Sequence, residues 1–135
     1  MKNQVLSIKQ MQELKELGID TSKASMCWIG CTDGNDVYPY NSTFKDIFES
    51  HKETIPSVLT PTFTLQDILE ILPREIKPFK GCKSWKVWLR LLPYVGNRWC
   101  VLYENPDEIF YKSEGENPLE AAFNILKWCK QNNYI

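Results

Sequence analysis

A basic and aromatic run in the middle of the chain carries the side chains best suited to binding chemistry. Between Arg74 and Arg90 the sequence has six basic residues against the single acid Glu75, which gives a net charge of +5. Three aromatic residues are interleaved with these charges: Phe79, Trp85 and Trp88. Aromatic rings stack on bases and basic side chains neutralise phosphates, so this composition is typical of a protein that binds single-stranded nucleic acid.

Strand alternation narrows this hypothesis to one face. Successive side chains of a strand point to opposite faces, so a strand through the run places Lys86, Trp88 and Arg90 on one face. Lys83 precedes this row along the chain. The candidate binding residues are therefore Lys83, Lys86, Trp88 and Arg90.

The same charges have a second interpretation, in which acids of this chain balance them. The segment from Glu104 to Glu120 contains six acidic residues against Lys112 alone. If this segment pairs with the basic strand in a meander, some of its acids lie opposite the basic residues and stabilise them. Trp88 would then pack beneath another element while Lys86 and Arg90 extend to solvent.

Cysteine and histidine are the other groups that could act in catalysis or hold a metal. Cys27 and Cys31, if they lie on a strand, are about 13 Å apart, too far to share one zinc ion, and no C-x-x-C pair exists. A cysteine nucleophile needs a basic partner, and His51 is the only histidine. Its neighbours are polar and typical of an exposed loop. An odd number of scattered cysteines favours reduced core thiols: Cys27, Cys31, Cys82, Cys100 and Cys129.

The remaining patterns predict no catalytic site. The acid pairs at 107–108 and at 114 and 116 lie among turn-forming and polar residues, which favours solvated carboxylates over one with a raised pKa. The glycines match neither the dinucleotide fingerprint nor the P-loop. We therefore expect no catalytic residues, no metal and no cofactor, and the sequence favours a protein that is not an enzyme. A small Cys/His enzyme remains a third alternative.

Size and composition suit one domain spanning residues 1–135. The chain is 43% hydrophobic and carries a net charge of -1, so the whole molecule has no general attraction for nucleic acid or anionic lipid. No apolar run approaches the roughly 18 to 20 residues that span a bilayer, and the N-terminus has no uninterrupted apolar segment. We expect a cytoplasmic protein that does not bind membranes.

A hairpin is the element that would position the basic face. Two apolar runs, 85–92 and 99–103, flank Gly96-Asn97, a pair that tolerates the positive φ of tight hairpin turns. Residues 85–92 fit a helical face as well as a strand, but their short length and the turn that follows favour a strand.

Two further signals extend the hairpin into a meander. Pro93 cannot donate a hydrogen bond to a neighbouring strand, so we expect it at a bulge, at an outward-facing edge position or at the strand's end. Residues 109–112 follow the turn at Asn105-Pro106-Asp107 and predict a third strand.

Three helices are predicted around this sheet. The first spans 7–17, opens with a Ser7-x-x-Gln10 capping box and ends at Gly18. A short one begins at Thr64 and ends before Pro73, and the last begins with Asn117 as its N-cap.

Between the first two helices the sequence predicts another hairpin. Residues 24–31 and 37–40 read as strands around the turn-rich stretch 32–36. The segment 41–56 fits a loop and a short helix equally well.

Four blocks of the sequence resemble a family of small uncharacterised bacterial proteins found on prophages and other mobile elements. The first block runs from 4–8 to 17–18, and the second is 21–26. The third runs from 63–69 to 72–73, and the fourth from 118–122 to 128–129. The resemblance implies a bacterial, intracellular setting and a single domain, and it brings no activity or catalytic residue with it.

Together these patterns predict an α+β domain, an antiparallel meander packed against the N- and C-terminal helices with a short additional helix. The leading functional hypothesis is a small non-enzymatic accessory or protein-interaction module with an unknown protein partner. Single-stranded nucleic-acid binding through the basic and aromatic face is the alternative. The oligomeric state is left open by the sequence.

Overall fold

The computed structural model describes residues 2–31, 34–39, 58–78 and 85–135. The chain forms two compact units, Met1–Asp67 and Ile68–Ile135, and each contains one antiparallel sheet. The two sheets and three α-helices of the described ranges confirm the predicted α+β class. The single domain over residues 1–135 stays a prediction.

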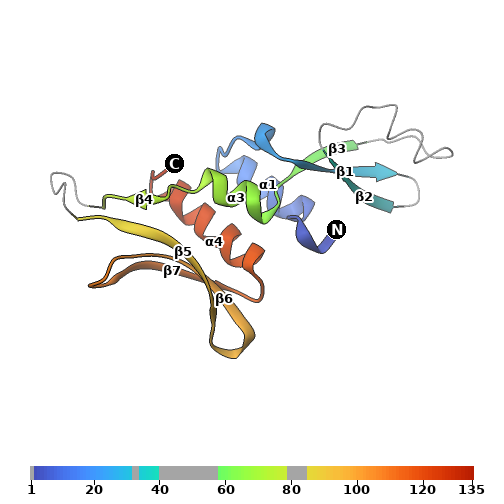
Figure 1. The fold of residues 1–135 in the computed structure, drawn as a ribbon. Helices are drawn as coiled ribbons and strands as arrows, with labels where there is room; N and C mark the ends of the chain where they lie inside the picture. Colours follow the sequence, from blue (N-terminus) through green and yellow to red (C-terminus); the bar gives the residue numbers. More distant parts are fainter. Residues whose placement is uncertain (1, 32–33, 40–57, 79–84) are drawn as a thin grey trace. The chain divides into compact units, whose positions relative to one another are not determined.

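The sheet of the first unit has three strands in the order β2-β1-β3 (Figure 1). The central strand β1 (Met26–Cys31) pairs with β2 (Gly34–Pro39) and β3 (Val58–Thr62). The β1–β2 pair confirms the predicted hairpin, but β2 begins at Gly34, within the stretch 32–36 that was predicted as a turn. The strand β3 was not predicted, because its Pro61 lowers the strand signal and its partner lies far away in the sequence. The segment 41–56, with His51, lies outside the described residues.

Helix α1 (Ile8–Glu16) begins as the capping box predicts. The Ser7 hydroxyl accepts from the Gln10 amide at 3.1 Å, and the Gln10 side chain accepts from the Ser7 amide at 2.9 Å, so two amides at the helix start are satisfied. Gly18 takes a φ of 84° just beyond the helix and confirms the predicted stop. Within the first unit α1 contacts β3. Its expected packing on the meander stays a prediction.

Helix α3 (Leu65–Ile71) starts from a reciprocal cap. The Thr64 hydroxyl accepts from the Asp67 amide at 3.2 Å, while the Asp67 carboxylate accepts from the Thr64 amide at 2.8 Å. The same carboxylate oxygen accepts from the Ser25 hydroxyl at 2.7 Å, so it fixes the helix start to the residue before β1. Three hydrogen bonds, one of them from the Ser25 amide, satisfy this nearly buried acid and give it a structural role.

The sheet of the second unit is a four-stranded meander in sequence order. Its strands are β4 (Glu75–Ile76), β5 (Val87–Tyr94), β6 (Arg98–Glu104) and β7 (Ile109–Gly115), and all neighbours are antiparallel. This confirms the predicted strands and adds the short β4. The strand β5 was predicted to start at Trp85, and it starts two residues later, at Val87.

The turn between β5 and β6 forms where Gly96-Asn97 predicts it. A 3-10 turn covers Val95–Asn97, and Gly96 and Asn97 have φ values of 72° and 61°. Both residue types tolerate this left-handed region. Tyr94 therefore pairs with Arg98, which fixes the register of the whole hairpin.

Pro93 lies on the outer edge of β5. The Leu89 amide donates to the Arg74 carbonyl on the β4 side, and alternate residues of a strand point their backbone groups the same way, so Pro93 faces that side too. The β4 strand reaches only Val87 and Trp88, and no strand in the described ranges pairs with β5 beyond it. Of the three predicted positions, the outward-facing edge position is confirmed.

Helix α4 (Pro118–Gln131) covers one face of the meander and contacts β6 and β7 (Figure 1). Asn117 caps it by accepting from the Glu120 amide at 2.8 Å, as predicted. The Tyr111 ring stacks on the Trp128 ring with centroids 3.9 Å apart. Val87, Val101 and Tyr103 on this face are fully buried.

Gly115 marks the closest approach of α4 to the sheet. A Cβ at this position would lie 2.5 Å from the Ala121 amide nitrogen and 2.9 Å from the Glu120 Cβ. These are parts of the helix rather than the end of a flexible side chain, so the helix itself would have to move.

We expect Gly115→Ala to lower the free energy of unfolding by about 2 to 3 kcal/mol, because overpacking of a close contact costs this much. Urea titration followed by circular dichroism measures the change. Gly96→Asn is the control, since a Cβ there meets nothing within 4 Å and asparagine tolerates the local φ. Equal stability of Gly115→Ala and the wild type would contradict the close packing.

Candidate functional site

The face of the meander opposite α4 carries the candidate binding residues, and we call it the open face. Along β5, Val87 is fully buried whereas Trp88 is 46% exposed and Arg90 is exposed. Lys86 precedes the strand by one residue and ion-pairs with Glu75, the register partner of Trp88. Lys86, Trp88 and Arg90 are thus brought together on one face. Lys83, the fourth candidate, lies outside the described residues.

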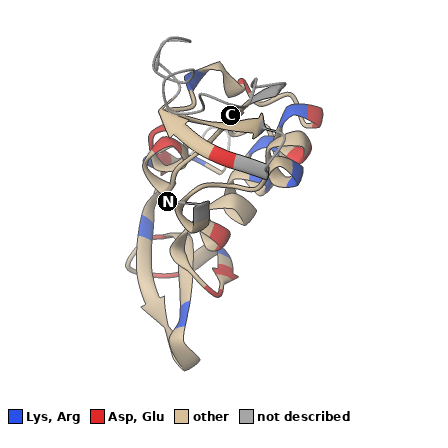
Figure 2. Cartoon of the chain, turned by 90° about the vertical axis from the view of Figure 1, so that its right-hand side faces the viewer, with Lys and Arg blue, Asp and Glu red and all other residues tan. Residues whose placement is uncertain are grey.

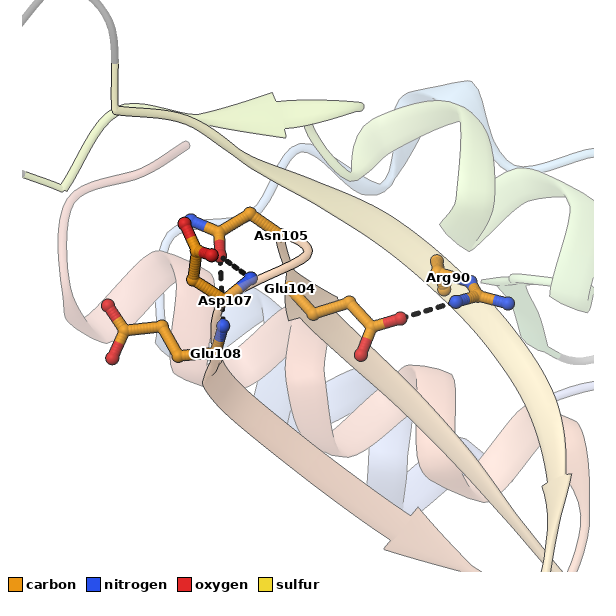
Figure 3. A network of polar contacts seen from close by, with 5 residues as sticks. All are labelled: Arg90, Glu104, Asn105, Asp107 and Glu108. Atoms are coloured by element: carbon orange, nitrogen blue, oxygen red, sulfur yellow. Dashed lines mark hydrogen bonds and ion pairs between the residues drawn. The ribbon is translucent and has the colours of Figure 1, made fainter.

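Each of the two described basic candidates has an acidic partner. The Arg90 guanidinium contacts the Glu104 carboxylate at 2.5 Å, and the Lys86 ammonium lies 3.8 Å from Glu75 (Figure 3 shows the first pair). Glu104 belongs to the acidic segment that the second interpretation of the charges placed opposite the basic strand. The contacts therefore favour internal balance over a free basic surface.

Asn105 organises the turn beside this pair. Its side-chain oxygen accepts from the amides of Asp107 and Glu108 at 2.9 Å each, and its amide group donates to the Lys86 carbonyl at 3.3 Å. In Figure 3 the carboxylates of Asp107 and Glu108 point away from the Arg90–Glu104 pair. Neither has an ion-pair partner among the described residues.

A second polar group lies toward the hairpin end of the open face. The Lys112 ammonium donates to the Tyr94 hydroxyl at 2.9 Å, lies 4.4 Å from the centre of the Tyr94 ring and pairs with Glu114 at 3.3 Å. The hydrogen bond to Tyr94 is the main reason that the pKa of Lys112 is raised. Basic and acidic residues are consequently interspersed along these strands (Figure 2).

A shallow hollow opens at the Trp88 end of the face. Its volume is about 240 Å³, and it is lined by Trp88, Arg90, Glu104, Asn105 and Pro106. Pockets for small molecules usually enclose about 300 to 1,000 Å³. This hollow therefore suits a single side chain of a larger partner better than a free metabolite. A hollow of about 220 Å³ in the first unit lies beside α1 and β3, and Lys15 is the one ionisable residue among the described residues that line it.

Three described cysteines, Cys27, Cys100 and Cys129, are buried and poorly suited to nucleophilic chemistry. Burial raises the pKa of each thiol, and for Cys129 it does so to about 11. Cys129 lies 3.7 Å from the Tyr103 hydroxyl, which donates to the Pro73 carbonyl at 2.8 Å, and burial raises the pKa of Tyr103 as well. Cys129 and Tyr103 belong to the core between α4 and the sheet.

The proposed Cys/His pairing involves residues that the structure does not describe. His51 and Cys82 lie outside the described residues, and the side chain of Cys31 does too. A Cys/His enzyme stays a prediction for these groups. In the described ranges no three histidine, cysteine, aspartate or glutamate residues come together in a way that could hold a metal ion.

Sequence interpretation identified the basic row and the acidic segment of Glu104 opposite it, but it missed two other partners, Glu75 and Tyr94. Glu75 follows Arg74 in a short strand that no pattern indicated, and Tyr94 was not linked to Lys112. The pairing of Trp88 with Glu104 follows from the turn, because Tyr94 opposite Arg98 sets every other pair of the hairpin. Counting outward from Gly96 would have found it.

Comparison with known proteins identifies no relative of this chain. No family model matches it, and neither the curated proteins nor the solved structures contain a significant match. The resemblance to small bacterial proteins of mobile elements stays a prediction. None of the helices in the described ranges combines the length and apolar character needed to span a bilayer.

We expect the three buried thiols to react with a thiol reagent only through unfolding. At pH 8 a thiol with a pKa of about 11 has a thiolate fraction roughly 100-fold lower than one at the ordinary value of 9.0. The test is reaction with Ellman's reagent in a Cys31→Ser/Cys82→Ser variant, with and without urea. Rapid reaction of the folded variant would contradict the burial.

The same thiol predicts a pH dependence of stability. Because the folded-state pKa of Cys129 is raised above the unfolded value, its contribution is complete below about pH 9 and is lost as the pH rises through about 11. Cys129→Ala, the control, should show a shallower decline of the free energy of unfolding over this interval.

Proposed function

We propose that this chain is a non-enzymatic protein-interaction module that binds its partner through the open face of the meander. The proposal is supported by the exposure of Trp88. This large aromatic side chain is 46% exposed and lines a hollow beside Arg90. Tryptophan, tyrosine and arginine are enriched among the few residues that dominate the binding energy of protein interfaces, where they fill well-packed pockets. The resemblance adds a bacterial, cytoplasmic setting on a mobile element to the proposal.

The charges of the open face support a protein partner. Three ion pairs, Lys86–Glu75, Arg90–Glu104 and Lys112–Glu114, cancel most of its charge. A surface with both signs and exposed aromatic rings offers hydrogen bonds and apolar contact without a strong field. Non-obligate protein interfaces have this mixed composition.

The alternative is single-stranded nucleic-acid binding, which the row Lys86, Trp88, Arg90 supports. A base could stack on Trp88 while the two basic groups contact phosphates. Glu75 and Glu104 oppose this use, because a phosphate must compete with a carboxylate already paired to each basic group.

We expect a protein captured from an extract of the source cells to depend on Trp88. Trp88→Ala should weaken binding of the purified captured protein by about tenfold or more, since truncating a central aromatic residue typically costs more than 1.4 kcal/mol. Titration calorimetry measures the change. Ile8→Ala, which removes an exposed apolar side chain from α1, is the matched control. Equal affinities of Trp88→Ala and wild type would refute the assigned surface.

For the alternative, we expect no binding of a fluorescent single-stranded oligonucleotide tighter than about 10⁻⁴ M at physiological salt, the weak end of non-specific association. Fluorescence anisotropy provides the measurement. Tighter binding that weakens with salt and is lost in both Trp88→Ala and Lys86→Glu would establish the alternative instead. Binding that both variants retain would place nucleic acid elsewhere on the chain.

A further inference from the structure

Opposite charges lie at the two ends of the open face, and no ion pair among the described residues includes them. Arg98 begins β6 and pairs in register with Tyr94, so it lies at the hairpin end and shares the face of Trp88 and Arg90. Asp107 and Glu108 lie in the turn at the other end of β6. Among the described residues none of the three forms an ion pair. Strand geometry separates the two ends by roughly 24 Å.

Exposed aromatic rings follow the same division. Trp88, 46% exposed, pairs with Glu104 at the acidic end, and Tyr94, 38% exposed, lies beside Arg98 at the basic end. Between them the ion pairs of Arg90 and Lys112 neutralise the middle of the face. The face is therefore neutral at its centre, positive at the hairpin end and negative at the opposite end.

We propose that the occupant of the open face is a second copy of this chain, packed face to face with its strands running in the opposite direction. A two-fold axis perpendicular to the strands brings the acidic end of each copy onto the basic end of the other. Asp107 and Glu108 then meet Arg98 of the second copy, and Trp88 meets Tyr94 of the second copy. Each contact occurs twice.

The charges select this orientation. With the strands of the two copies running in the same direction, Arg98 would face Arg98 and the carboxylates would face each other, and such like-charge contacts are unfavourable. A partner whose surface carries charge of a single sign is attracted by one end of the face and repelled by the other. A second copy satisfies both ends.

The size of the face limits the strength of the dimer. Four strands about 4.8 Å apart make a face roughly 14 Å wide and 24 Å long, well below the roughly 800 Å² per partner of a standard interface. We therefore expect a weak dimer that forms with increasing concentration. This inference rests on the proposed function, since it uses the same face.

Sedimentation equilibrium of the full-length protein tests the dimer. We expect a monomer–dimer equilibrium with a dissociation constant below about 1 mM, weakened at high salt because the end contacts are exposed ion pairs. Arg98→Glu should weaken it by about tenfold, and Asp107→Lys/Glu108→Lys should do the same. The triple variant with all three reversals should restore it, because the complementary ends are then exchanged between the copies.

Lys130→Glu is the matched control, since it reverses a charge on α4, which covers the other face of the sheet. It should dimerise like the wild type. Circular dichroism verifies that every variant is folded, and the salt dependence of the wild type tests the same contacts without any substitution.

Three outcomes would overturn the inference: a wild-type protein that stays monomeric up to about 1 mM, a dimer that Arg98→Glu leaves intact, or a triple variant that does not recover. A monomeric protein that still binds a different protein through Trp88 would overturn the second copy and leave the interaction function standing. A monomer that retains no partner would overturn both.

Discussion

The packing of α4 on a single face of the meander is the constraint on which the second unit depends. The helix approaches β7 so closely at Gly115 that a methyl group there would collide with the Ala121 backbone, and Ser113 donates to the Ala121 carbonyl at 3.0 Å at the same place. With α4 committed to one face, the residues on the other must remain compatible with water. The alternation of β5, with Val87 inward and Trp88 outward, follows from this asymmetry.

The open face nevertheless contains apolar side chains, which its polar residues shield. Cys100 and Leu102 alternate with the inward residues of β6, and yet both are buried. Their register partners on the adjacent strands include Arg90 and Lys112, which are held in place by Glu104 and Tyr94. Long side chains can cover apolar surface with their aliphatic parts while their charged ends remain in water. The ion pairs therefore serve packing as well as charge balance.

Local signals were predictable from the sequence, and non-local ones were not. The caps at Ser7 and Asn117 and the turn at Gly96 depend on residues within a few positions of each other, so their patterns stand in the sequence directly. The strands β3 and β4 gain their hydrogen bonds from distant partners, and their own residues, Pro61 in one and only two positions in the other, give little strand signal. The candidate site divides in the same way: alternation predicted the row of Lys86, Trp88 and Arg90, whereas Glu75 as a partner depends on β4.

Pro93 has a consequence for how copies of this chain can assemble. An exposed strand edge with unpaired amides can accept another strand, which in turn exposes a new edge, so association of that kind has no natural end and leads toward fibres. At the outer edge of β5 the proline lacks the amide that such growth requires. When two copies pack face to face about a two-fold axis, each buries the same surface against the other. No such surface is left for a third copy, so assembly stops at two. The β5 edge thus favours finite assemblies over open-ended ones.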